Sequence, residues 1–165
     1  MIDTIFPLRE CELFKDLEDE ELTRVAIISE EIELTEAAPL FCEDQPAEQI
    51  YIVTQGKIAL HKMLGAKFGQ PSRRFATVAF CSPGQIVGWS ALVEPYRYTL
   101  SATAWEPCQL LGISSALLRR AMELNPGIGY RVMKCLSEVM GRRLQQVTQS
   151  LTIARESPIP ERRRF

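Results

Sequence analysis

Histidine is nearly absent from this chain of 165 residues, because His61 is the only one. A metal site built on three histidines is therefore excluded, and no Cys-x-x-Cys-His segment is present to attach a haem. A serine–histidine–aspartate triad would have to use the same histidine, which lies far from any Gly-x-Ser-x-Gly turn. We interpret His61 as a sheet residue, since it lies in a segment with strand character. The sequence therefore predicts a protein without catalytic activity.

Long apolar runs and grouped cysteines are also missing. No run approaches the roughly 18 apolar residues of a membrane helix, and the first residues lack the pattern of a signal peptide. The cysteines are odd in number and widely spaced, which is typical of buried reduced thiols rather than of a disulfide framework or an iron–sulfur cluster. They are Cys11, Cys42, Cys81, Cys108 and Cys135. We therefore expect a cytoplasmic protein with no membrane association.

Positive charge is scarce in the first part of the chain and negative charge in the rest. Residues 1–48 hold 15 acidic and 3 basic residues, whereas residues 49–165 hold 6 acidic and 16 basic residues. The two parts thus carry about −12 and +10, although the net charge is only −2. An anionic ligand or partner would be drawn to the second part. Its basic clusters at residues 73–74 and 162–164 are either solvated surface charge or contacts for a partner.

The pattern along the chain predicts one domain over residues 1–155 and a basic tail over residues 156–165. Residues 9–28 are predicted to form N-terminal helices, since apolar residues recur there at helical spacing. Residues 31–113 alternate short segments rich in β-branched residues with Gly, Pro or polar turns, which is typical of a β-barrel or sandwich. Residues 114–155 are predicted to be helical again. The chain is too short for two domains of typical size.

Residues 84–104 predict a phosphate pocket, because they combine a glycine-opened helical turn with an arginine loop between two strands. Gly88 precedes the turn, so the backbone can approach a ligand and direct unpaired amide N–H groups at an anion. Arg97 would neutralise the charge of that anion, and the hydroxyl groups of Ser90 and Thr99 lie in the same pair of loops. The alternative is an ordinary surface turn between two strands.

Several segments, in this order and spacing, resemble one known family. Residues 13–17 and the acidic helix start after them are similar to its N-terminal helical segment, and residues 50–60 to its strand, tight turn at Gly56 and second strand. Residues 82–88 are similar to the run into its phosphate-binding cassette, and residues 91–92 fit the Ala-Leu of that cassette. The family is the cyclic-nucleotide-binding domain, the sensor module of the catabolite activator protein and of kinase regulatory subunits. The resemblance covers nearly the whole chain. It implies a mainly β fold with flanking helices, a double-stranded β-helix (jelly-roll) barrel followed by a long dimerisation helix.

The resemblance also implies a ligand site, in which two side chains depart from the family's pattern. The implied ligand-binding residues are Gly88, Trp89, Ser90, Ala91, Leu92, Arg97, Tyr98 and Thr99. Trp89 stands where the family has a glutamate that holds the ribose hydroxyl, and Tyr98 where it has an arginine on the cyclic phosphate. An indole cannot accept hydrogen bonds from a diol. We therefore expect weak or absent cyclic AMP binding and predict no cofactor. The ligand, if the site is used, is a cyclic nucleotide or another phosphorylated molecule. Since neighbouring strand residues face opposite ways, only one of Arg97 and Tyr98 can face the pocket.

A long C-terminal helix is predicted over residues 128–155. Its apolar residues keep three- and four-residue steps over roughly six turns: Val132, Met133, Leu136, Val139, Met140, Leu144, Val147 and Leu151. A helix of about 40 Å is long for packing on one small barrel alone, so we expect a homodimer formed through it. Residues 157–160 prevent further helix, and those that follow are too few for a DNA-reading module. We therefore expect no direct sequence-specific DNA binding, and an output passed to another, unidentified protein.

Two functional hypotheses follow, and Trp89 distinguishes them. In the first, the chain is a sensing module, and a small anionic ligand at residues 88–92 and 97–99 changes the long helix. In the second, the chain is a dimeric scaffold that binds a partner protein, with a degenerate pocket filled by Trp89. Trp89 stacked on a base would favour sensing, whereas Trp89 buried as a plug would favour the scaffold.

Overall fold

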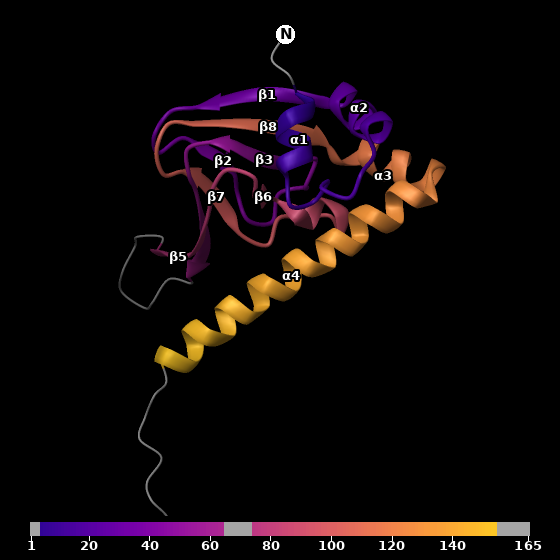
Figure 1. Cartoon of the computed structure of the whole chain (residues 1–165). Coiled ribbons are helices and arrows are strands. Elements are labelled where there is room, and N and C mark those ends of the chain that lie inside the picture. Colours follow the sequence, from indigo (N-terminus) through magenta and orange to yellow (C-terminus); the bar gives the residue numbers. More distant parts are fainter. Residues whose placement is uncertain (1–3, 65–73, 155–165) are drawn as a thin grey trace, which may run out of the picture.

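Two four-stranded antiparallel sheets, flanked by helices, make up the computed structural model, which describes residues 4–64 and 74–154 (Figure 1). The strands are β1 (Ser29–Leu34), β2 (Pro39–Phe41), β3 (Gln49–Gln55), β4 (Ile58–Leu64), β5 (Arg74–Cys81), β6 (Ile86–Val87), β7 (Ser101–Ala104) and β8 (Cys108–Ser114). The helices are α1 (Ile5–Glu10), α2 (Asp19–Ile27), the 3-10 turn η1 (Trp89–Leu92), α3 (Ser115–Leu124) and α4 (Pro126–Ala154). The predicted mainly β fold with flanking helices and a long C-terminal helix is confirmed.

The sheets have the orders β1-β8-β3-β6 and β2-β7-β4-β5, so consecutive strands often lie in different sheets. Apolar side chains from both sheets, from the N-terminal helices and from the first half of α4 share one buried core. Strand β6 is short and lies at the edge of its sheet, paired with β3 only through residues 51–52. This edge position matters for the site, because η1 follows β6 directly.

Helix boundaries differ in detail from the sequence-based expectation. The predicted N-terminal helices are α1 and α2, but α1 begins before residue 9 and turns at residues 11–16 separate the two. Helix α4 begins at Pro126, earlier than expected, because proline fits the first helical position and Asn125 Oδ1 accepts hydrogen bonds from the N–H groups of Gly127 and Ile128. The predicted tail, residues 156–165, lies outside the described residues.

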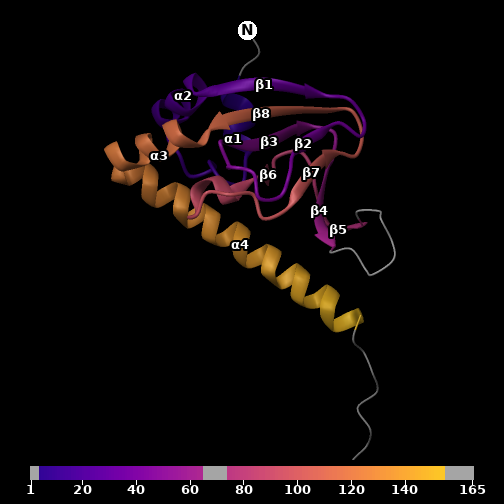
Figure 2. The same cartoon turned by 180° about the vertical axis from the view of Figure 1, so that it is seen from behind.

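Helix α4 has three faces. One face is buried against the barrel and consists of Ile128, Val132, Cys135, Leu136 and Val139. A second face pairs with the N-terminal region through Arg131, Lys134, Glu138 and Arg142. The third face is apolar and exposed, and we call it the α4 stripe: Met133, Met140, Leu144, Val147 and Leu151. Figures 1 and 2 show that α4 runs diagonally along the barrel and that its C-terminal end lies away from it.

Candidate functional site

The candidate site is the segment formed by β6, Gly88 and η1, residues 86–92, which we call the cassette. Gly88 has a φ of 81°, in the left-handed region that side chains rarely adopt. A Cβ atom at this position would also lie only 2.9 Å from Cε1 of Tyr98. Glycine is thus required here for two reasons, the backbone turn and the close approach of an aromatic ring.

The ring of Tyr98 closes the cassette from inside. It stacks on Phe41 with ring centroids 3.7 Å apart and planes inclined by 10°, and only 4% of the residue is exposed. The hydroxyl donates a hydrogen bond to the carbonyl oxygen of Gln49 at 2.7 Å. Burial, and next the neighbouring Tyr51, raise the pKa of Tyr98, so the phenol stays protonated and keeps donating. Tyr98 is therefore held by stacking and by a hydrogen bond, and its side chain is buried.

The space left at the cassette is a cavity of about 20 Å³. Its lining residues are Phe41, Leu60, Gly88, Trp89, Ser90, Tyr98, Thr99, Leu100 and Arg143. Such a volume is enough for about one water molecule, whereas small-molecule sites usually measure roughly 300–1,000 Å³. In this arrangement the cassette has no room for a nucleotide.

The implied site residues that do not line the cavity have other positions. Ala91 and Leu92 are buried in the core on the inner side of η1. Arg97 is exposed and pairs through its backbone with Pro46, so Tyr98 is the member of the Arg97–Tyr98 pair that faces inward. Trp89, which does line the cavity, is half-buried and packs against the core, and the plugging role considered for it belongs to Tyr98.

Two arginines from the C-terminal helices hold the cassette, and sequence reasoning singled out neither. Arg119 of α3 donates to the carbonyl oxygen of Ala91 at 2.5 Å, and its guanidinium lies 4.1 Å from the ring centre of Tyr96. Arg143 of α4 donates to the carbonyl oxygen of Ile86 at 2.5 Å. The sequence signal for Arg143 was its spacing, four residues after Val139 on the buried face of α4.

The positive charge of the lysine next to Thr99 is balanced by a carboxylate of the same chain. Lys62 forms an ion pair with Glu43 and also donates to the carbonyl oxygen of Thr99 at 3.4 Å. The hydrogen bond from Lys62, assisted by that from the N–H of Met63, holds the pKa of Glu43 below its usual value. Glu43 therefore stays ionised, and the positive charge of Lys62 has its own counter-ion.

The described residues contain no cluster of three or more histidine, cysteine or acidic side chains able to hold a metal ion. His61 lies in β4 between the hydroxyl groups of Thr77 and Thr103, as expected for a sheet residue. The expectation of buried thiols holds for four of the five cysteines, and Cys42 is exposed. In residues 4–64 and 74–154 no helix has the length and apolar character needed to cross a membrane.

Comparison with known proteins identifies the fold and the family. The model of the cyclic nucleotide-binding domain matches residues 31–125. A putative cyclic nucleotide-binding protein from Geobacter metallireducens is 30% identical, with a TM-score of 0.72 over 87% of this chain and 99% of that one. A cyclic nucleotide-binding domain from Methylobacillus flagellatus is 17% identical and shares the fold, with a TM-score of 0.75 over 94% of this chain and 84% of that one.

Among curated proteins, the chain is similar to the nitrogen fixation regulation protein FixK of Azorhizobium caulinodans. The two are 33% identical over 79 residues, which is 48% of this chain and 28% of FixK. This chain therefore matches less than a third of that regulator's length. The match of the family model to more than half of the chain, together with the shared fold, shows that this protein belongs to the cyclic nucleotide-binding domain family.

Proposed function

We propose that this chain is a non-catalytic regulatory module that acts as a homodimer and passes its signal through α4 to a partner protein, without a ligand in its cassette. The observation that carries the proposal is the position of Tyr98. Its ring stacks on Phe41, its hydroxyl donates to the carbonyl oxygen of Gln49, and the ring takes up the volume that a ligand would need. The similarity to a nitrogen fixation regulation protein supports a regulatory role.

The α4 stripe supports the homodimer. Its side chains are 37–68% exposed and follow one another along one face at steps of three, four and seven residues. Such spacing is that of a seam between two helices. Gly141 lies close to this seam, and a Cβ atom there would meet nothing within 4 Å, so a second backbone can approach. A second copy of the chain would cover the stripe.

A second candidate function is the sensing of a small anion, a cyclic nucleotide or another phosphorylated molecule, after Tyr98 moves out. The observation that favours it is the polar part of the cavity lining, which comprises Ser90, Thr99 and Arg143 beside Gly88. In this case the guanidinium of Arg143 replaces Arg97 as the positive group nearest the ligand. Sensing requires the loss of the Tyr98 stack, which opposes binding.

A thermal-shift screen of nucleotides and phosphorylated metabolites tests the proposal. A ligand that binds only the folded state raises the Tm, so the closed cassette predicts no shift for the wild type. Arg97→Ala is the matched control, since this exposed side chain points away from the cavity. A compound that raises the Tm of the wild type and of Arg97→Ala, but not of Arg143→Gln, would establish the second candidate instead.

A further inference from the structure

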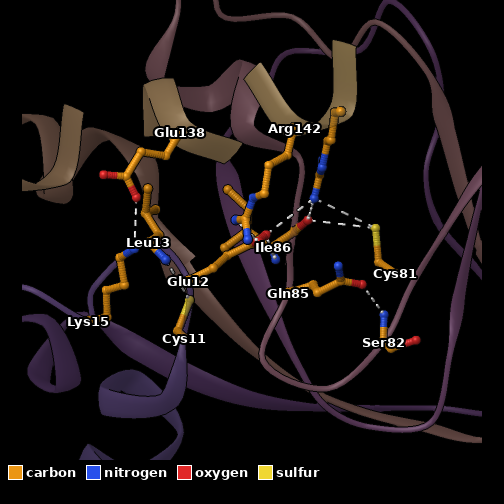
Figure 3. A network of polar contacts seen from close by, with 11 residues as sticks. Cys11, Glu12, Leu13, Lys15, Cys81, Ser82, Gln85, Ile86, Glu138 and Arg142 are labelled. Carbon is orange, nitrogen blue, oxygen red and sulfur yellow. Dashed lines mark hydrogen bonds and ion pairs between the residues drawn. The ribbon is translucent and has the colours of Figure 1, made fainter. Parts of the chain in front are cut away.

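The edge of β6 is closed by charged side chains instead of by another strand. Ile86 lies opposite Ile52 of β3, and its own N–H and C=O groups bond elsewhere. The N–H donates to Oε1 of Glu12 at 3.1 Å, and the C=O accepts from Arg143 at 2.5 Å. Glu12 and Arg143 are 74 and 57 residues away in sequence. Both polar groups of one cassette residue are thus bound by two distant segments, of which Figure 3 labels Glu12.

Glu12 is the residue that joins all three segments. Its Oε2 accepts from Arg142 at 2.8 Å, and its Oε1 lies 3.5 Å from the guanidinium of Arg143. Its backbone N–H donates to the carbonyl oxygen of Gly84, in the turn before β6. The side chain is only 14% exposed. One carboxylate of the N-terminal region therefore contacts both the cassette and α4, as Figure 3 shows for Glu12, Ile86 and Arg142.

Arg143 lies where the apolar residues of α4 change from buried to exposed. It is four residues after Val139, a fully buried residue on the same face, and just before Leu144 of the exposed stripe. Its side chain is 23% exposed and lines the cassette cavity. A displacement of β6 would leave the charges of Glu12 and Arg143 short of hydrogen bonds in a partly buried place, which is costly. Helix α4 can avoid that cost by moving with β6.

The other ion pairs between the N-terminal region and α4 lack this connection. Lys15 pairs with Glu138 at 2.7 Å, and Lys134 with Asp16 at 2.8 Å, with side chains 33–48% exposed. They dock the N-terminal region on α4 but make no hydrogen bond to β6. Exposed pairs of this kind contribute little to stability. Glu138 therefore offers a matched control for Glu12.

We propose that Glu12 is a coupling residue: by binding Ile86 together with Arg143, it makes the cassette and α4 move as one unit. The proposal deepens the proposed function, since it names how the state of the cassette and the position of the output helix depend on each other. The simpler role, in which Glu12 only satisfies the edge of β6, requires no such dependence.

Hydrogen exchange measured by mass spectrometry distinguishes the two roles. Tyr98→Ala disturbs the cassette from inside, and the readout is the exchange of α4 amides at residues 139–147. The substitution is made in chains with Glu12, with Glu12→Ala and with Glu138→Ala. All chains also carry Leu144→Glu and Leu151→Glu, which set like charges on the stripe of any homodimer and are expected to keep the chain monomeric. The result therefore does not depend on the dimer, and Tyr98→Phe replaces Tyr98→Ala if the latter fails to fold.

Coupling predicts that Tyr98→Ala speeds amide exchange in α4 by roughly three- to ten-fold in the chain that keeps Glu12 and in the Glu138→Ala chain. In the Glu12→Ala chain the same substitution should speed exchange by less than about two-fold. Glu12→Ala alone should speed exchange of the Ile86 amide about ten-fold or more, and Glu12→Gln, which still offers an acceptor, by less. An equal response of α4 with and without Glu12 would overturn the proposal, as would no response in any chain. Neither result bears on whether the cassette is closed, which the thermal-shift screen tests separately.

Discussion

The cassette and the α4 stripe, the two surfaces that the family resemblance and the long helix point to, are in opposite states. In the cassette, an aromatic side chain from the same chain fills the space and leaves about 20 Å³. On α4, a row of apolar side chains lies uncovered, with Leu144 68% exposed. Single exposed apolar residues are common, whereas a continuous row on one face is typical of an interface. The contrast favours a module that binds protein through its helix over one that binds small molecules in its interior.

The largest expected effect comes from emptying the cassette. Tyr98→Ala removes a stacked ring from a closed site and should lower the free energy of unfolding by about 3–5 kcal/mol. Tyr98→Phe keeps the ring and loses the hydrogen bond to Gln49, at a cost of about 1 kcal/mol. Urea denaturation checks both values. The exposed Arg97→Ala should stay within about 0.5 kcal/mol of the wild type. If Tyr98→Ala is as mild as Arg97→Ala, the ring does not fill the site as described.

Charge on the α4 stripe should break the homodimer without unfolding the domain. Leu144→Glu combined with Leu151→Glu places four carboxylates in the proposed seam, and we expect monomers in analytical ultracentrifugation at micromolar concentration. Gln145→Glu with Gln149→Glu adds the same charge away from the stripe and should leave the dimer intact. Leu136 does not serve for this test, because it is buried against its own barrel. If the wild type is already monomeric, the α4 stripe is not a homodimer interface.

Two glycines with almost equal φ separate backbone strain from ring contact. Gly88 and Gly84 have φ of 81° and 84°, but the added Cβ lies 2.9 Å from the Tyr98 ring at Gly88 and 3.4 Å from the nearest atom at Gly84. Both alanine variants lose stability by about 1–2 kcal/mol from strain. Gly88→Ala should lose about 1 kcal/mol more by chemical denaturation, because it also displaces the ring. Equal losses would mean that the ring can move aside freely.

The smallest expected effect is a pH dependence of the contact between α4 and the N-terminal region. The hydrogen bond from Lys15 lowers the pKa of Glu138, and that from Lys134 lowers the pKa of Asp16. Each of these carboxyl groups has a lower pKa in the folded state than in the unfolded state. The pairs therefore stabilise the domain at pH values above the ordinary carboxyl pKa, near pH 4, and this stabilisation is lost as the pH falls. The small difference in unfolding free energy between wild type and Glu138→Gln at pH 7 should therefore shrink and vanish as the pH falls through the lowered pKa of Glu138 in the folded state. A difference that grows on acidification would contradict this sign.

The sequence predicted the kinds of element well, because short β-branched segments and a long three-and-four apolar pattern have few alternative folds. It did not separate the two apolar faces of α4. Leu136 and Leu144 share one spacing pattern, and only packing shows that the first faces the barrel and the second faces outward. The family pattern located the cassette, but the phase of the strand at Arg97 and Tyr98 depends on a backbone turn that no local pattern fixes. Glu12 and Arg143 meet only through tertiary structure, so no sequence signal paired them.

Sedimentation equilibrium of the wild type, with and without excess cyclic AMP, tests the central claim most directly. A closed cassette and a stripe that pairs by itself predict a dimer in both conditions with the same dissociation constant. Linkage requires that a nucleotide bound preferentially by one form shift this equilibrium. A chain that is monomeric in both conditions, or one whose dimer constant changes when cyclic AMP is added, would contradict the account.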